Sequence, residues 1–276
     1  MQKLKKKFKK NPLLYSVIGA VFAMALILVS VFLLMDGTQP PVQQATPIQI
    51  DPGIRPIPYS ADDFVQNRDG FMECVSQPFT TGIDVSVYQG QIDWEKVKEA
   101  GVEYVFIRVG GRGSESGALY TDDNAQNNYK GAKKAGLQVG AYFFSQAISE
   151  EEAREEAEFA LAQLKGWQLD LPLAYDWEWA EKGSRTDKMT GKLLTRCTLA
   201  FCQTVEDAGI QPMIYFNESQ GLDMLDLAEL QQYPFWLALY DGAMDFPYRV
   251  DYWQYSESGK VDGIDASVDL NIYLPS

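Results

Sequence analysis

Residues 171–179, Leu171-Pro-Leu-Ala-Tyr-Asp-Trp-Glu-Trp179, combine a run of apolar residues with two acids near its end. We expect a buried strand, along which side chains alternate between faces, so Asp176 and Glu178 point to the same side. Two residues of strand rise would separate their Cα atoms by roughly 6.6 Å. Two carboxyl groups this close in an apolar setting favour the retention of one proton near neutral pH. A proton donor beside an anion is the minimum equipment for cleaving a glycosidic bond. An ordinary strand that runs into an acidic loop is the competing interpretation.

A pattern of apolar strand, polar turn and amphipathic helix repeats along the chain from Thr81 onward. It predicts strands at 83–88, 102–109, 137–144, 169–177, 211–216, 235–240, 250–255 and 267–273. Helices are expected after each of the first five strands, at 93–100, 122–135, 149–164, 188–208 and 219–231. Five strand–helix units and three further strands predict an α/β fold, an irregular (β/α)5β3 TIM-like barrel. An open doubly wound sheet is disfavoured, because no Gly-x-Gly-x-x-Gly follows the first strand.

Two further acids fall inside predicted strands, where aspartate is disfavoured. Asp84 lies in the first strand and Asp269 in the last. These strands are neighbours in a closed barrel, so the two side chains are expected to approach each other. A functional pair and a hydrogen-bonded structural pair are both compatible with this pattern.

Composition removes several classes of chemistry. The 276 residues are 46% hydrophobic and 13% aromatic, enough for a large core. The absence of histidine excludes Ser-His-Asp and Cys-His catalysis and any zinc site that uses histidine. Cys74, Cys197 and Cys202 are too few for a disulfide framework. We expect no cofactor, and the spacing of the acids does not demand a metal.

The N-terminal region reads as a membrane anchor. Six lysines within residues 1–12 precede residues 13–35, a stretch of 23 residues without a charge. This length suits a transmembrane signal-anchor helix, and the lysines place the N-terminus in the cytoplasm. A cleaved signal peptide is the alternative, but the apolar run is long and no Ala-x-Ala site follows it. We therefore expect a single-pass protein of the cell membrane with the rest of the chain outside the cell.

The segment after this stretch is rich in proline. Residues 36–59 are expected to form an extended linker, residues 60–79 a pre-domain segment with a short helix, and residues 80–276 the barrel. Residues 11–276 contain the other 18 Lys and Arg and all 38 Asp and Glu, which gives this part of the chain a net charge of −20. Such a body is not expected to bind nucleic acid through its phosphates.

Motifs along the barrel resemble glycoside hydrolase family 25, the Chalaropsis-type lysozymes (N-acetylmuramidases) that cleave bacterial peptidoglycan. They follow the family's order from about residue 80 to the C-terminus: Gly82-Ile-Asp-Val-Ser86, Gln89-Gly90, Ile92-Asp-Trp94, Phe106-Ile-Arg-Val109, Asp122 with Asn128 and Ala132, Gly140-Ala-Tyr-Phe-Phe144, Asp176-Trp-Glu178, Ile214-Tyr215, Trp236-Leu-Ala238, Trp253-Gln-Tyr255 and Val268-Asp-Leu-Asn271. One position departs from the pattern, because the family has Tyr-His-Phe where this chain has Tyr142-Phe-Phe144. The missing histidine is expected to remove a polar group near the cleft floor.

The resemblance implies roles for the four acids and a substrate. Glu178 would be the general acid, and Asp176 would stay ionised, facing the oxocarbenium-like centre, orienting the 2-acetamido group or acting as nucleophile. Asp84 and Asp269 would anchor this arrangement or position water. The expected substrate is the β-1,4 bond between N-acetylmuramic acid and N-acetylglucosamine in peptidoglycan glycan strands. Substrate-binding side chains are expected at Tyr142, Tyr175, Tyr215, Trp236, Tyr240 and Gln254, and Trp253 is a further aromatic candidate.

Two other functions fit the same sequence. One is a non-catalytic, membrane-tethered module that binds the cell wall or acts as a scaffold. The missing histidine supports this alternative. The other is a glycosidase of another amino-sugar polymer such as chitin. Retention, inversion and substrate assistance all remain open, as does an envelope protein partner.

Overall fold

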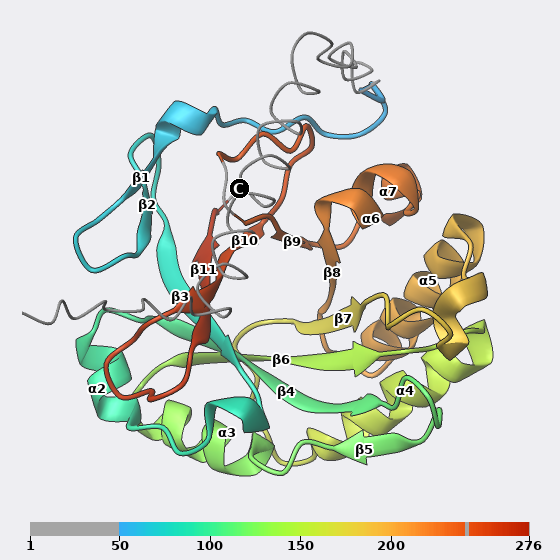
Figure 1. Cartoon of the computed structure of the whole chain (residues 1–276), viewed down its shortest axis with the longest axis horizontal. Coiled ribbons are helices and arrows are strands. Elements are labelled where there is room, and N and C mark those ends of the chain that lie inside the picture. The colour runs from blue at the N-terminus through green and yellow to red at the C-terminus, as the bar shows by residue number, and fades with distance from the viewer. Residues whose placement is uncertain (1–49, 241–242, 276) are drawn as a thin grey trace, which may run out of the picture. The chain divides into compact units, whose positions relative to one another are not determined.

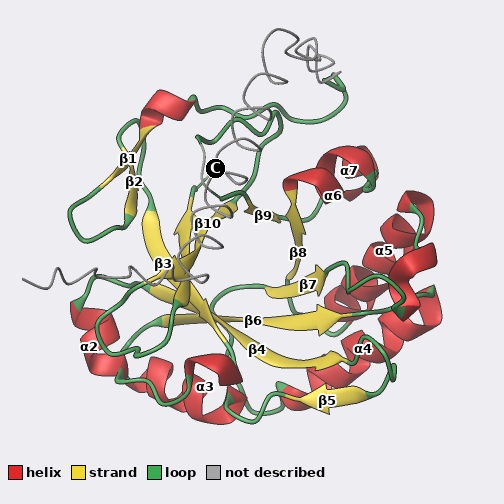
Figure 2. Ribbon diagram, viewed as in Figure 1, coloured by secondary structure: helices red, strands yellow, loops and turns green. Residues whose placement is uncertain are grey.

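Eight strands close into a barrel at the centre of the computed structural model, which describes residues 50–240 and 243–275 (Figures 1 and 2). The barrel strands are β3 (Thr80–Val85), β4 (Tyr104–Arg112), β6 (Gln138–Ser145), β7 (Leu173–Trp177), β8 (Pro212–Asn217), β9 (Phe235–Ala238), β10 (Tyr252–Gly259) and β11 (Val268–Tyr273). The pairs from β3 through β10 are parallel, whereas β11 runs antiparallel between β10 and β3. The predicted α/β barrel of eight strands is confirmed, and the antiparallel direction of β11 is a finding of the structure.

Helices follow each of the first five barrel strands and lie outside the barrel (Figure 2). They are α2 (Trp94–Glu99), α3 (Ala125–Lys134), α4 (Glu150–Gln163), α5 (Gly191–Asp207), α6 (Glu218–Asp223) and α7 (Leu227–Leu230), with short 3₁₀ turns η2 (Val87–Gln89) and η3 (Arg185–Lys188). Side chains cap several N-termini, as Ser149 does for α4 and Thr190 for α5. The helix expected at 219–231 is two helices, because Asp226 accepts from the backbone N–H of Glu229 and begins a new one.

Residues 60–79 form a hairpin where the sequence suggested a short helix. Strands β1 (Phe64–Gln66) and β2 (Met72–Cys74) pair antiparallel after one 3₁₀ turn, η1 (Ala61–Asp63). The Asn67 side chain accepts from the backbone N–H groups of Asp69 and Phe71, and Gly70 takes a positive φ of 89°. The hairpin is therefore specified by its turn. It packs on the barrel through Phe64, whose ring lies 5.1 Å from Trp253.

The end of the proline-rich segment also packs on the barrel. Ile54 is buried, the N–H of Ile57 donates to the carbonyl of Pro247, and the N–H of Arg249 donates to the carbonyl of Arg55. The compact unit accordingly begins at Ile50, so residues 50–59 are not the free spacer that the prolines predicted. The predicted basic tail, the transmembrane segment and residues 36–49 lie outside the described residues. Within the described ranges, no helix is both long and apolar enough to cross a membrane.

Aromatic side chains fill the barrel interior and form a floor. Phe106 stacks on Trp236 at 4.7 Å and meets Tyr104 edge-on at 5.7 Å. A Cβ on Gly82 would lie 2.1 Å from the Tyr104 ring, so this strand approaches the ring only because it has glycine there. The packed interior leaves the carboxyl ends of the parallel strands as the open end of the barrel.

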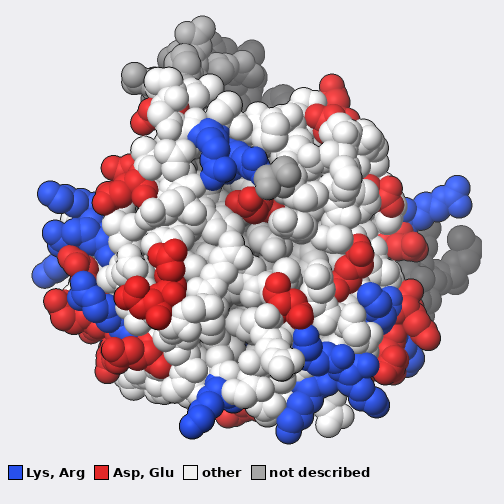
Figure 3. All heavy atoms as spheres, turned by 180° about the vertical axis from the view of Figure 1, so that it is seen from behind, with Lys and Arg blue, Asp and Glu red and all other residues white. Residues whose placement is uncertain are grey.

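Seen from behind, acidic and basic side chains are interspersed around the rim of the molecule (Figure 3). The prediction that the chain does not bind nucleic acid stays a prediction.

Candidate active site

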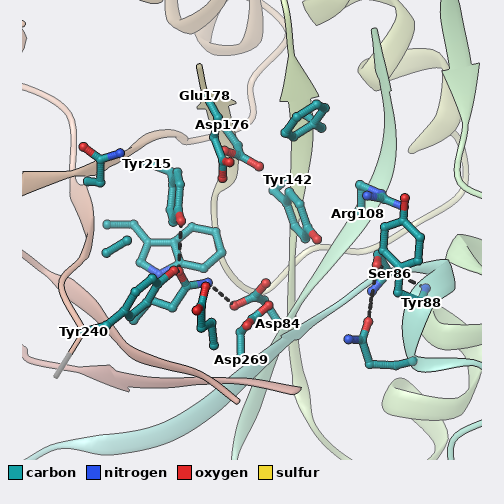
Figure 4. Close-up of a pocket in the computed structure, with 17 residues that line it drawn as sticks. Asp84, Ser86, Tyr88, Arg108, Tyr142, Asp176, Glu178, Tyr215, Tyr240 and Asp269 are labelled. Carbon is teal, nitrogen blue, oxygen red and sulfur yellow. Dashed lines mark hydrogen bonds between the residues drawn. The ribbon is translucent and has the colours of Figure 1, made fainter. Parts of the chain in front are cut away.

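A cleft of about 370 Å³ opens at the carboxyl ends of the barrel strands (Figure 4). All four predicted acids line it, and so do five of the predicted substrate-binding residues: Tyr142, Tyr215, Trp236, Tyr240 and Gln254. Ser86, Tyr88, Gln89, Arg108, Phe144, Asn217, Ala238 and Glu257 complete its walls. The barrel thus brings together residues that are spread over more than 180 positions of the chain.

Asp176 and Glu178 leave strand β7 toward the cleft, as the alternation of side chains predicted (Figure 4). The two carboxyl groups are hydrogen-bonded to each other. Burial raises the pKa of Asp176 well above its ordinary value, and the neighbouring charge of Glu178 raises it further. Burial also raises the pKa of Glu178, while the hydrogen bond with Asp176 opposes this rise. Both carboxyl groups are therefore harder to ionise than free acids, which favours the retention of one proton by the pair.

Asp176 is the more deeply buried of the two acids, and the expectation that it stays ionised stays a prediction. Asp176 is 5% exposed, and its Oδ1 has no hydrogen-bond partner among the described residues. A buried oxygen without a donor disfavours the anion. Glu178 is more open to solvent, which lowers the cost of a negative charge there.

Asp84 and Asp269 lie directly opposite each other on the antiparallel strands β3 and β11. Asp84 Oδ2 accepts from Gln254 Nε2 at 2.7 Å and from Asn271 Nδ2 at 2.8 Å. Burial raises the pKa of Asp269 to about 9, and the charge of Asp84 adds to the rise. Burial raises the pKa of Asp84 too, but hydrogen bonds from Asn271, Gln254 and Asp269 oppose this. At neutral pH the Asp269 carboxyl is protonated and donates to Asp84.

Hydrogen bonds fix the orientation of the Gln254 amide. The hydroxyls of Tyr240 and Tyr215 donate to Gln254 Oε1 at 2.6 Å and 2.9 Å, which leaves Nε2 to face Asp84. Trp236 Nε1 similarly donates to Asn271 Oδ1 at 2.7 Å. The predicted substrate-binding residues therefore also hold the acids in place.

Three aromatic side chains lie outside the cleft. Tyr175 faces the opposite side of β7 from Asp176 and packs on Phe201 at 4.7 Å, so its prediction as a substrate contact is corrected. Trp253 packs in the outer core and donates from Nε1 to the carbonyl of Leu239. Phe143, at the family's histidine position, packs on Phe159 and not near the cleft floor. Strand alternation is the common reason, because the neighbours of an inward residue point outward.

Two buried glutamines hold the backbone of the acidic motif, and sequence reasoning missed both. Gln146 Nε2 donates to the carbonyl of Glu178 at 2.7 Å, and Gln220 Nε2 donates to the carbonyl of Trp177 at 2.9 Å. Each glutamine is at most 1% exposed. Because Gln146 directly follows β6 and Gln220 lies in α6, both are distant in sequence from the acidic motif, and no local pattern signalled them.

Arg108 is the other functional candidate that the sequence did not single out, although it lies within the quoted Phe106-Ile-Arg-Val109 motif. Its Nε donates to Asp122 Oδ2 at 2.8 Å, and its guanidinium carbon lies 5.0 Å from the centre of the Tyr88 ring. Within the described ranges, no group of three acidic, cysteine or histidine side chains is arranged to hold a metal ion.

Comparisons with known proteins agree on one family. The family model described as glycosyl hydrolases family 25 matches residues 83–264. The autolytic lysozyme of Clostridium acetobutylicum is 32% identical over 192 residues, which cover 69% of this chain and 54% of that protein. Lysozyme M1 of Streptomyces globisporus is 29% identical over 204 residues, covering 69% of this chain and 66% of that protein. This chain thus spans about half to two thirds of the length of these two relatives. The crystal structure of a bacterial lysozyme from Streptomyces coelicolor superposes with a TM-score of 0.60 at 28% identity, covering 71% of this chain and 93% of that one.

Proposed function

The chain belongs to glycosyl hydrolases family 25, and we propose that it is a peptidoglycan hydrolase, specifically an N-acetylmuramidase. The bond cleaved would be the β-1,4 linkage between N-acetylmuramic acid and N-acetylglucosamine. The observation that carries the proposal is the Asp176–Glu178 pair, two hydrogen-bonded carboxyl groups that share a proton at the open end of the barrel. The similarity to proteins named lysozymes supports the choice of polymer.

Glu178 is the proposed general acid. Transfer of the shared proton from Asp176 to Glu178 lets Glu178 protonate the oxygen of the leaving sugar. The same transfer leaves Asp176 as an anion, which stabilises the positive charge that develops on the sugar ring. These are the two roles that the resemblance implied for Glu178 and Asp176.

We propose that the 2-acetamido group of the substrate acts as the nucleophile. Inverting enzymes need about 6.5–9.5 Å between their carboxyl groups to admit a water, and retaining enzymes need about 5–5.5 Å to attack across the sugar. Carboxyl groups in direct hydrogen-bond contact satisfy neither requirement. Asp176 then orients and polarises the acetamido group, and the Asp84–Asp269 pair supports the cleft floor through Gln254.

The test is an end-group analysis of digested peptidoglycan. The purified full-length chain, its Glu178→Gln variant and a Glu181→Gln control, which alters an exposed acid nearby, are each incubated with peptidoglycan and reduced with borohydride. We expect muramitol ends from the unaltered chain and the control only, as seen by mass spectrometry. Reduced glucosamine ends would contradict the assigned bond, and a lack of new ends with glycan binding intact would support the wall-binding module instead.

We also propose that residues 13–35 anchor the protein in the cell membrane, with the barrel on the outer side. The support is the 23-residue stretch without a charge and the six lysines that precede it. Such a tether would restrict hydrolysis to the cell's own wall, in growth, division or assembly of a surface complex. Protease added to intact cells should degrade the barrel while the chain fractionates with membranes. Release of the active barrel into the medium would contradict the anchor.

A further inference from the structure

The cleft holds one fixed cation among many acids. Five carboxyl groups line it, those of Asp84, Asp176, Glu178, Glu257 and Asp269, whereas Arg108 is the only Lys or Arg among its described lining residues. An anionic group on a substrate would be repelled by this wall except beside Arg108. The position of the arginine therefore decides where such a group can bind.

The guanidinium of Arg108 is held rigidly from one side. Its Nε donates to Asp122 Oδ2, and the same oxygen also accepts from the backbone N–H of Val87 at 2.9 Å. Asp122 Oδ1 accepts from the N–H of Asn124 at 3.0 Å, and the Asp122 side chain is fully buried. An arginine locked at Nε loses little conformational freedom when its remaining N–H groups bind a ligand.

The rest of the guanidinium is available to a ligand. No described residue accepts a hydrogen bond from either Nη of Arg108, although its side chain is only 10% exposed and lines the cleft. Two parallel N–H groups of an arginine match the two oxygens of a carboxylate. Tyr88, which is 76% exposed, covers one face of the guanidinium and lies with it at one side of the cleft, apart from the Asp176–Glu178 pair (Figure 4).

We propose that Arg108 is a specificity-determining residue that binds a carboxylate of the muramyl unit through its Nη groups. This inference rests on the proposed function, since it concerns the substrate of the same cleft. The carboxylate has two possible sources: the lactyl group of N-acetylmuramic acid in glycan without peptide stems, and the stem peptide in glycan that carries it. A polymer of N-acetylglucosamine alone has neither, so Arg108 would favour muramyl glycan over chitin.

The test measures binding separately from cleavage. The full-length chain carrying Glu178→Gln is titrated calorimetrically with a stem-free tetrasaccharide of alternating N-acetylglucosamine and N-acetylmuramic acid, and with its neutral form in which each lactyl carboxylate is coupled to methylamine. The same comparison is repeated with a stem-bearing tetrasaccharide and its amidated form. A charge-assisted bidentate contact predicts a preference of roughly 10- to 100-fold for one of the carboxylate forms.

Adding Arg108→Gln should abolish this preference, and Arg108→Lys should leave part of it. Arg154 is an exposed arginine on α4, so the control substitution Arg154→Gln should not change the preference. A preference in the stem-free pair identifies the lactyl carboxylate, and one confined to the stem-bearing pair identifies the stem. A preference that survives Arg108→Gln, or no preference in either pair before Arg108 is altered, overturns the proposal. The absence of a preference is measured before Arg108 is altered, so this outcome does not depend on whether an Arg108 variant folds. If the preference depends on Arg108 but the unaltered chain makes no muramitol ends, the proposed function fails and the binding role stands.

Discussion

Replacing Asp269 with asparagine tests whether the Asp84–Asp269 pair stores a proton in the folded protein. The pKa of Asp269 is about 9 in the structure, whereas its ordinary value is 3.8. Between these pH values the folded chain binds one proton more than the unfolded chain. Stability conferred by this group is therefore fully present below about pH 4 and is lost progressively as the pH rises toward 9.

The size of the effect follows from the linkage of proton binding and folding. One proton of difference changes the free energy of unfolding by roughly 1.4 kcal/mol for each pH unit, or about 3 kcal/mol between pH 5 and pH 7. Asparagine has no proton to lose, and its amide can donate to Asp84 as the protonated Asp269 does. The stability of Asp269→Asn relative to the unaltered chain should therefore rise by about 3 kcal/mol over this range.

Urea unfolding of the compact unit from Ile50 onward, at pH 5, 6 and 7, measures this difference. Asp265→Asn serves as the control, because it removes a carboxyl from an exposed position in the loop before β11. Its stability curve should run parallel to that of the unaltered protein. A difference between Asp269→Asn and the unaltered chain that stays constant from pH 5 to pH 7 would show that Asp269 is ionised in the folded state. The assignment of the shared proton would then be wrong.

Three further experiments use five substitutions to test interactions in the cleft and behind it. Glu156→Gln removes one of the two carboxylate partners of Arg112 in β4. It should cost roughly 1.5–3 kcal/mol of unfolding free energy at pH 8, where Glu156 (pKa about 7) is ionised. Glu155→Gln, which removes the 59%-exposed partner of the same arginine, should cost less than about 1 kcal/mol in the same urea titration, and equal costs would contradict this account. Tyr240→Phe removes one hydrogen bond and should lower kcat/KM on soluble glycan about fivefold. Tyr175→Phe, which alters a residue outside the cleft, should change kcat/KM by no more than about twofold. Equal losses would place Tyr175 in the site. Gln220→Ala frees the backbone that carries the acidic motif, so it should lower kcat about tenfold with little change in KM, and a change confined to KM would argue against a positioning role.

Local patterns predicted the barrel well because most of its elements are specified by neighbouring residues. Apolar runs of strand length and side-chain caps such as Ser149 mark where the barrel strands and α4 lie. The same local logic failed where a short turn decides the structure. The hairpin after Phe64 depends on the Asn67 side chain and Gly70, and the break before α7 depends on Asp226. Both are short capping or turn interactions inside segments whose composition also suits a helix.

The sequence by itself determined the order of strands and helices, the side of β7 on which Asp176 and Glu178 lie, and the resemblance to one family. Only the tertiary structure decided how the acids share protons and which other residues serve them. Asp84 meets Asp269 through the register of β3 and β11, and it meets Gln254 across 170 positions of the chain. Protonation depends on burial and on the donors around each oxygen, and both arise only when distant strands close the barrel.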